Sequence, residues 1–190
     1  MLIQLIHLLL KKQGAEAALR FIDEEARPQI SFPLIHIIMH EIGHEAYHET
    51  HTIKAALSYI PRDTNAVEWI FDYYGYYHGV IEECFKTYYP KRTFADLSRE
   101  ACSEYLEPSF FEAPVGTYKR IISAECFHSI GHAAMRIFQN NVVISLEHCA
   151  ALPHVSMQEW CYSGVFMENA NLYFSFYEPE RPRPNTQSDD

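Results

Sequence analysis

The sequence predicts an all-α protein with a single helical domain. Apolar residues recur at three- and four-residue intervals along most of the chain, which is the spacing of amphipathic helices. No segment shows the sustained two-residue alternation of a strand with one buried face. The 190 residues are enough for one domain to bury a core. We expect this domain to span residues 1–178, and the polar, proline-rich tail over 179–190 to be disordered.

Caps and prolines set the boundaries of the expected helices. A helix over 15–26 ends before Pro28, and Ser31 and Pro33 then supply an N-cap and a first-turn proline for the next helix. An aromatic segment over 67–89 follows, and we expect it to be interrupted at Gly75 and Gly79. Residues 1–12 are an amphipathic helix or the edge of an excised domain. Besides the interrupted aromatic segment, we expect helices over 15–26, 31–50, 53–59, 93–106, 118–139, 142–152 and 156–174.

The charge and the hydropathy pattern argue against two classes of partner. The 15 lysines and arginines and the 25 acidic residues give a net charge of -10, which disfavours binding to a nucleic-acid backbone. No stretch reaches the roughly 18 apolar residues of a transmembrane span. The lysines at the N-terminus follow a short apolar run, whereas a signal peptide carries them before it. We therefore expect no signal peptide, and the compartment stays open between the cytoplasm and an excised extracytoplasmic domain.

The cysteines allow more than one arrangement. The chain has 5 cysteines and no CxxC pair, which argues against a zinc ribbon and against a complete disulfide framework. Cys149 and Cys161 could form one disulfide, and Cys84 and Cys102 another. Buried free thiols are an equally good interpretation.

An internal duplication is the most informative feature of the sequence. A His-x-x-Gly-His motif occupies 40–44 and recurs at 128–132 with an offset of 88, and a motif sharing Tyr, Gly, Val and Glu occupies 77–83 and recurs at 162–168 with an offset of 85. The glycine before the second histidine of each first motif allows close approach of another helix or a ligand. Two helical repeats related by a pseudo-two-fold axis are therefore expected. The predicted repeats are about 35–90 and about 120–175.

The repeated residues are typical metal ligands. Two histidines four residues apart project from one face of a helix, and each repeat also carries a glutamate on its next long helix. If the repeats pack through these faces, a mixed nitrogen and oxygen set converges, as in metal sites of helix bundles. The alternative is a hydrogen-bonded structural network of buried histidines and glutamates. The predicted ligands are His40, His44, Glu83, His128, His132 and Glu168.

His78 breaks the symmetry of the repeats, because its counterpart is Ser163. It could be a fifth ligand or a general acid/base, or equally a turn histidine without a role in the site. His36 and His48 extend the histidine stripe of the first repeat by one turn in each direction. Because they have no repeat partners, we expect them outside the ligand set.

Two resemblances suggest a function. The segment His40-Glu41-Ile42-Gly43-His44 is an HExxH motif and resembles the zinc helix of zincin metallopeptidases, which implies zinc on the two histidines and water activation by Glu41. The second copy has Ser129 in place of Glu41, so the repeated feature is HxxGH. Over roughly 35–169, the pairing of HxxGH with YHGVxxE also resembles a family of prokaryotic helical proteins without an established activity.

Together these features predict a metal-binding helical protein whose site is shared by two repeats. As an enzyme it would use the metal to activate water or dioxygen, with His78 or Glu41 moving protons. Zinc or iron fits the ligand set best, and manganese or copper is compatible with it. A small-molecule substrate is a further expected partner. The alternatives are a zincin-like zinc hydrolase and a metal-free binding module with a structural histidine and glutamate core.

Overall fold

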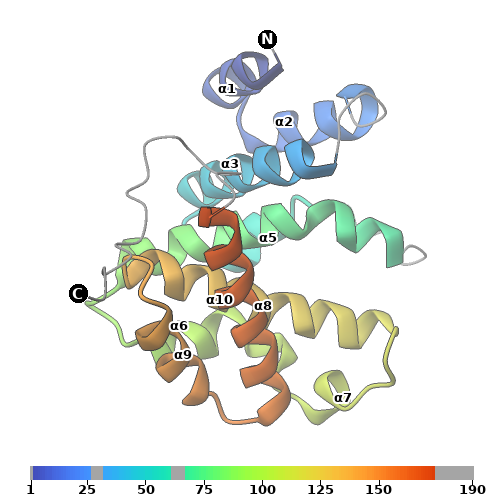
Figure 1. Cartoon of the computed structure of the whole chain (residues 1–190). Coiled ribbons are helices and arrows are strands. Elements are labelled where there is room, and N and C mark those ends of the chain that lie inside the picture. Colours follow the sequence, from blue (N-terminus) through green and yellow to red (C-terminus); the bar gives the residue numbers. More distant parts are fainter. Residues whose placement is uncertain (1, 27–31, 61–66, 174–190) are drawn as a thin grey trace.

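The fold is helical throughout the part of the chain that the computed structural model describes, which is residues 2–26, 32–60 and 67–173 (Figure 1). No strand occurs among these residues, so the all-α prediction is confirmed. The predicted disordered tail over 179–190 lies outside the described residues. The elements are α1 (Leu2–Gln13), α2 (Ala15–Phe21), a π-helical turn (Ile22–Ala26), α3 (Phe32–Thr50), α4 (Ile53–Leu57), α5 (Val67–Tyr88), α6 (Phe94–Ala101), a 3-10 turn (Ser103–Tyr105), α7 (Pro108–Phe111), α8 (Tyr118–Ile137), α9 (Val142–Ala150) and α10 (Val155–Tyr173).

Two of the predicted elements differ from the observed ones. The aromatic segment forms one continuous helix, α5, despite its glycines. The helix expected over 93–106 already ends at Ala101, and a 3-10 turn and the short α7 follow it. Thr93 caps α6 by accepting a hydrogen bond from the backbone N–H of Asp96, as the preference of threonine for N-caps predicts.

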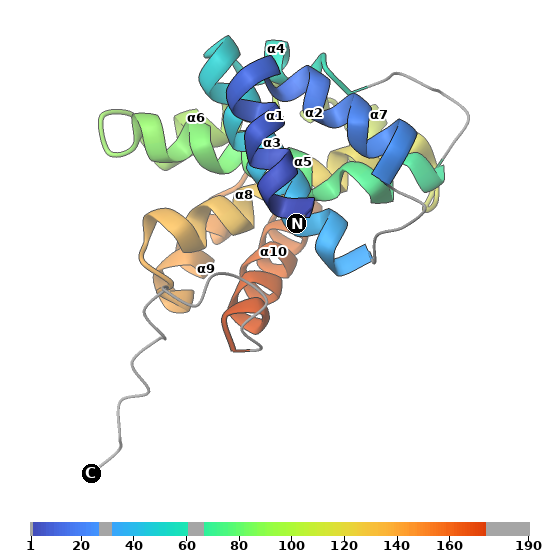
Figure 2. The same ribbon diagram turned by 90° about the horizontal axis from the view of Figure 1, so that it is seen from above.

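Four long helices, α3, α5, α8 and α10, form the centre of the molecule. In chain order, α3 packs on α5, α5 on α8, and α8 on α10. Figures 1 and 2 show α1 and α2 covering the outer side of α3, while α9 lies against α8 and α10 on the opposite side. Among the described residues, no helix combines the length and the apolar character needed to cross a membrane.

Glycines let α3 and α5 cross in backbone contact. A methyl group added to Gly79 would overlap the carbonyl oxygen of His40, and one added to Gly43 would overlap that of Tyr76. Both glycines are therefore required by the packing rather than by backbone conformation. The glycine before His44 thus allows another helix to approach closely, as the sequence predicts.

Helices α8 and α10 cross in the same manner. A methyl group on Gly164 would overlap the carbonyl oxygen of His128, and one on Gly131 would overlap that of Cys161. Gly131 follows Gly43 by 88 residues and Gly164 follows Gly79 by 85, which are the offsets of the two sequence motifs. The two helix pairs therefore bring their histidines to the centre through equivalent contacts.

Two disulfides fasten the periphery to this centre. Cys149–Cys161 joins α9 to α10, which confirms one of the pairs that the sequence allows. The other pair that the sequence allows, Cys84 with Cys102, does not form, because Cys102 at the end of α6 is bonded to Cys126 of α8. Cys84 is a buried free thiol on α5. Sequence spacing could not show that α6 runs back against α8.

Candidate metal centre

Five histidines gather where α3, α5, α8 and α10 meet. We call them the histidine cluster: His36, His40, His78, His128 and His132. Three of them, His40, His78 and His132, are at most 2% exposed, and His36 and His128 are half-buried beside them. A buried imidazole needs a partner for each ring nitrogen, so these partners decide what the cluster can do.

Within the cluster, ring nitrogens face one another. Nε2 of His40 lies 3.3 Å from Nε2 of His36 and 3.2 Å from Nδ1 of His78. On the other side of His78, Nε2 of His132 lies 3.2 Å from Nε2 of His128. The ring of His78 stacks on that of His132 with centroids 4.1 Å apart, so His78 stands between the two sets.

On the α8 and α10 side, the other nitrogen of each ring faces an oxygen. Nδ1 of His132 lies 3.0 Å from Oε2 of the buried Glu168. Nδ1 of His128 lies 2.7 Å from the hydroxyl oxygen of Ser163. Such outer contacts to an oxygen fix the tautomer and the orientation of histidines that bind metals.

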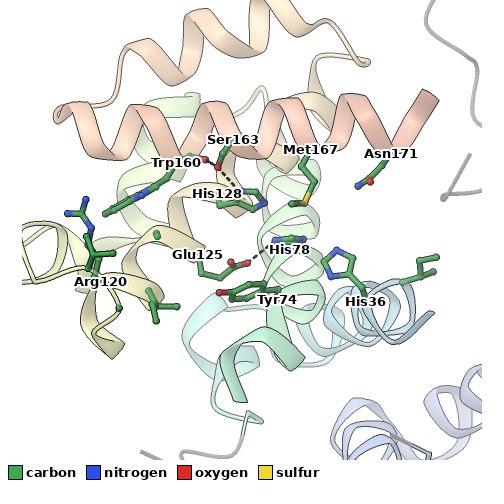
Figure 3. A pocket seen from close by; sticks show the side chains of 15 residues that line it. His36, Tyr74, His78, Arg120, Glu125, His128, Trp160, Ser163, Met167 and Asn171 are labelled. Atoms are coloured by element: carbon green, nitrogen blue, oxygen red, sulfur yellow. Dashed lines mark hydrogen bonds and ion pairs between the residues drawn. The ribbon is translucent and has the colours of Figure 1, made fainter. Parts of the chain in front are cut away.

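The same pattern holds on the α3 and α5 side. Nε2 of His78 lies 2.8 Å from Oε1 of Glu125, a residue of α8 (Figure 3). Nδ1 of His40 faces Oε2 of Glu82 at the longer distance of 3.6 Å. Four imidazoles of the cluster thus have one nitrogen directed to an oxygen and the other directed to a second imidazole.

This arrangement leaves lone pairs pointing at one another. A neutral imidazole carries one ring proton, and a carboxylate oxygen attracts that proton to the nitrogen facing it. Nδ1 of His132 faces Glu168, and Nδ1 of His128 faces a Ser163 hydroxyl that donates its own proton to the Trp160 carbonyl, so both ring protons lie on the outer side. At the inward Nε2 atoms of His128 and His132, 3.2 Å apart, two lone pairs then repel each other. A cation between them removes this repulsion, which gives the cluster the chemistry of a metal-binding site.

The spacing of the inward nitrogens fits a metal ion. Ligand nitrogens bound at 2.0–2.1 Å to a tetrahedral zinc ion lie roughly 3.3–3.4 Å apart. The observed separations are 3.2 and 3.3 Å. Two groups of three, His36/His40/His78 and His78/His128/His132, have ligand atoms that all lie within 4.8 Å of one another. The geometry can therefore accommodate one ion on either side of His78.

Burial keeps four imidazoles of the cluster, those of His36, His40, His78 and His128, in the neutral form that binds metals. Burial, followed by the neighbouring imidazoles, lowers the pKa of His36 and of His128 to about 3. The same causes lower the pKa of His78, and burial also lowers the pKa of His40 although Glu82 opposes it. These rings are therefore unprotonated at neutral pH, and no second ring proton is present to join the facing nitrogens.

Two of the buried carboxyl groups next to the cluster, those of Glu82 and Glu125, differ in charge. Burial raises the pKa of Glu125 to about 8. Burial acts in the same direction on Glu82, but Arg136 and His40 outweigh it and hold its pKa well below the ordinary value. Nε of Arg136 lies 2.7 Å from Oε2 of Glu82, which also contacts Nε2 of His44 at 3.2 Å. Oε1 of Glu82 has no hydrogen-bond partner among the described residues.

The structure brings most of the predicted site residues together. The ones that lie in or against the histidine cluster are His40, His44, His78, His128, His132 and Glu168. Glu83 does not: its Oε1 pairs with His48 at 3.2 Å, and its Oε2 pairs with Lys86 at 3.1 Å. His48 and Lys86 are 55% and 66% exposed, so Glu83, although itself only 5% exposed, is directed to surface partners and not to the cluster.

Sequence reasoning missed three members of the site, and helical spacing could have found them. Glu82 lies four residues after His78 and shares its face of α5, whereas Glu83 is turned about 100° away. His36 lies four residues before His40, and Glu125 lies three before His128. The repeat alignment hid them, because none of the three has a like residue in the other repeat.

Glu41, the base of the HExxH interpretation, faces a different part of the molecule. It lines a cavity of about 460 Å³, together with His44, His48, Glu83 and other charged residues. The group His40, His44 and Glu82 nevertheless has ligand atoms within 4.8 Å of one another.

An apolar cavity gives access to the histidine cluster. It has a volume of about 680 Å³, and His36, His78 and His128 form part of its lining. Figure 3 shows these rings between Tyr74 and the α10 side chains of Ser163 and Met167. A cavity of this size suits a small organic molecule.

Comparisons with protein-family models, with curated proteins and with solved structures give no match for this chain. Both resemblances, to zincins and to the prokaryotic helical family, therefore stay predictions. The function has to be argued from the chemistry of the site.

Proposed function

We propose that this protein binds one or two transition-metal ions through the histidine cluster, and that the α3–α5 and α8–α10 pairs are two repeats of an ancestral unit. The observation that supports metal binding most strongly is the orientation of His40, His78, His128 and His132. Each ring turns one nitrogen to an oxygen and the other to an imidazole. The equivalent glycine contacts at the two helix crossings support the duplication.

The donor set indicates the kind of metal. Imidazole nitrogens suit zinc, iron and copper, whereas calcium and magnesium prefer oxygen ligands. The cluster is rich in nitrogen, with carboxylates in contact with the outer ring nitrogens. Zinc or iron therefore fits best, and copper or manganese is a less favoured occupant. The proposed ligands are the five histidines of the cluster, so His36 and His78 join the set, while the predicted His44, Glu83 and Glu168 lie outside it.

A metal in this position would serve a reaction in the apolar cavity. His36, His78 and His128 line the cavity, so a bound ion would have a side open to a small molecule. When bound there, such an ion would activate water or dioxygen. His78 contacts Glu125 on the wall of the same cavity, and this pair is the proposed path for protons. We propose a metalloenzyme on this basis.

A zincin-like hydrolase is the second candidate, because His40, His44 and Glu82 also form a compact group. In this alternative Glu41 would act as the base. The contact of Arg136 with Glu82 weighs against it, since a guanidinium beside that carboxylate competes with a metal ion.

Metal retention in four variants, His40→Gln, His44→Gln, His132→Gln and a control, separates these alternatives. The shared site predicts that His132→Gln and His40→Gln, purified without a tag, each lose most of the metal found in the parent protein. His51→Asn is the control, because His51 is exposed and has a positive φ that asparagine tolerates.

Other outcomes favour the alternatives. If His44→Gln and His40→Gln lose metal and His132→Gln retains it, the zincin-like site replaces the shared one. If the parent protein and every variant are equally metal-free after incubation with zinc and iron(II), the cluster is a structural network.

A further inference from the structure

Arg120 lines the apolar cavity, and no acidic side chain of the described residues pairs with it. The Arg120 guanidinium lies over the ring of Trp160, with its central carbon 4.6 Å from the ring centroid. Among the described residues, no carboxylate forms an ion pair with Arg120, although other arginines are paired. These pairs are Arg92–Glu100, Arg99–Asp96 and Arg136–Glu82.

The carboxyl group closest in sequence on the cavity wall, Glu125, is directed elsewhere. It lies 2.8 Å from Nε2 of His78. Figure 3 shows Arg120 and Trp160 on one side of the cavity and His36 on the other, with Glu125 between them. The cavity is therefore apolar along its length, with a cation at one end and imidazoles at the other.

The length of the cavity follows from α8. Arg120 and His128 lie eight residues apart on this helix, which is about 12 Å at 1.5 Å per residue. Ile121 and Ala124 line the cavity between them, and Met167 lines it from α10. A ligand that fills this space needs an apolar body of similar length.

We propose that the cavity binds an amphipathic carboxylate, with the carboxylate on Arg120 and the apolar body extending to the histidine cluster. The planar guanidinium matches a carboxylate through two parallel hydrogen bonds, and stacking on Trp160 holds it ready for them. The proposal rests on the proposed function in that the far end of the ligand faces the proposed metal ligands.

Because the chain is acidic overall, its net charge cannot account for the binding of an anion in the cavity. At -10, the overall field repels anions and favours cations. A preference of the cavity for a carboxylate over a cationic amphiphile must therefore come from a local positive group. Arg120 is the candidate on the cavity wall.

Calorimetric titration with three ten-carbon probes tests the proposal: decanoate, 1-decanol and decyltrimethylammonium. We expect decanoate to bind at least roughly tenfold more tightly than the other two, in chelated and in metal-loaded protein alike. Arg120→Gln should abolish this preference, and the surface control Arg99→Gln should keep it. Ala124→Phe, which fills the cavity, should weaken decanoate binding at least roughly tenfold while the helical circular dichroism is retained.

Three results would overturn the proposal: no binding of decanoate, equal affinity for all three probes, or a preference that Arg120→Gln leaves intact. A preference that appears only in metal-loaded protein would show that the ion binds the carboxylate. That result would overturn the role of Arg120 while supporting the proposed metal site. If decanoate binds as expected to protein that takes up no metal, the cavity assignment stands and the proposed function fails.

Discussion

The α3–α5 pair and the α8–α10 pair approach the histidine cluster from opposite sides, and they differ beyond the crossing. In the first pair a third glycine, Gly75, continues the close contact, and a methyl group there would overlap the carbonyl oxygen of His36. The residue 85 positions later is Trp160, which lines the apolar cavity. One pair therefore stays closed along its length, whereas the other opens beside Trp160.

This difference shows how one kind of helix crossing can serve two purposes. The closed pair contributes one more imidazole here, because His36 lies where the other pair has Ala124, 88 positions later. The open pair contributes space, since Ala124 and Trp160 are both on the cavity wall. The backbone contacts at the crossings position the cluster. The residues beyond each crossing then decide whether a further histidine or a cavity lies beside it.

The largest expected effect comes from breaking either crossing. Gly79→Ala and Gly164→Ala each force a methyl group against a backbone carbonyl, which cannot move without separating the helices. We expect each to lower the free energy of unfolding by about 3 kcal/mol or more. Urea unfolding followed by circular dichroism measures this loss. Full stability in one of the two variants would show that the crossings are not equivalent.

The next effect distinguishes the two neighbouring glutamates of α5. Glu82→Gln leaves the charge of Arg136 without its carboxylate, and we expect a loss of about 2 kcal/mol. Glu83→Gln disturbs only pairs with exposed partners and should cost less than about 1 kcal/mol. Chemical unfolding of both variants makes the comparison. Equal losses would contradict the assignment of Glu82 to the site and Glu83 to the surface.

Acid should destabilise the metal-free protein through the buried histidines. The folded-state pKa of His36 and of His128 is about 3, below the ordinary 6.5, so the unfolded chain binds more protons between these values. Stability therefore falls as the pH drops, by about 1 kcal/mol per histidine between pH 6.5 and 5.5.

Glu125 changes the stability with pH in the opposite direction. Its pKa is raised to about 8, so its contribution is present below pH 4.5 and is lost as the pH rises to about 8. Unfolding of chelated protein from pH 5 to pH 8 measures both contributions. The expected net stability rises from pH 5 to about 6.5, and a steady decrease over this interval would contradict the buried neutral imidazoles.

The smallest expected loss of stability comes from Ser163, which stands where the other helix pair has His78. Ser163→Ala removes the hydroxyl that contacts Nδ1 of His128 and should cost about 1 kcal/mol. Ser103→Ala, at an exposed position, is the matched control. Thermal unfolding of the two variants shows the difference. Identical melting temperatures would mean that Ser163 does not hold the ring.

The fold class was predicted correctly from the sequence. Five of the six predicted metal ligands lie in or against the cluster. Both results depend on local spacing along helices. Helical periodicity identified the long helices, and the two HxxGH motifs marked the faces that meet. Glu83 was predicted because the repeat alignment matched it to Glu168, whereas the face of α5 that is turned to the cluster carries Glu82. The cavity could not be predicted, since it depends on Gly75 and Trp160 facing different neighbours in the folded chain.

The most direct test of the metal site is elemental analysis of the purified, untagged protein before and after chelation, with melting temperatures recorded for both. The account predicts one or two equivalents of zinc or iron per chain, and a melting temperature that falls on chelation and recovers when the metal is returned. A protein that contains no metal, takes up none of zinc, iron(II), manganese or copper, and melts at one temperature throughout would contradict it.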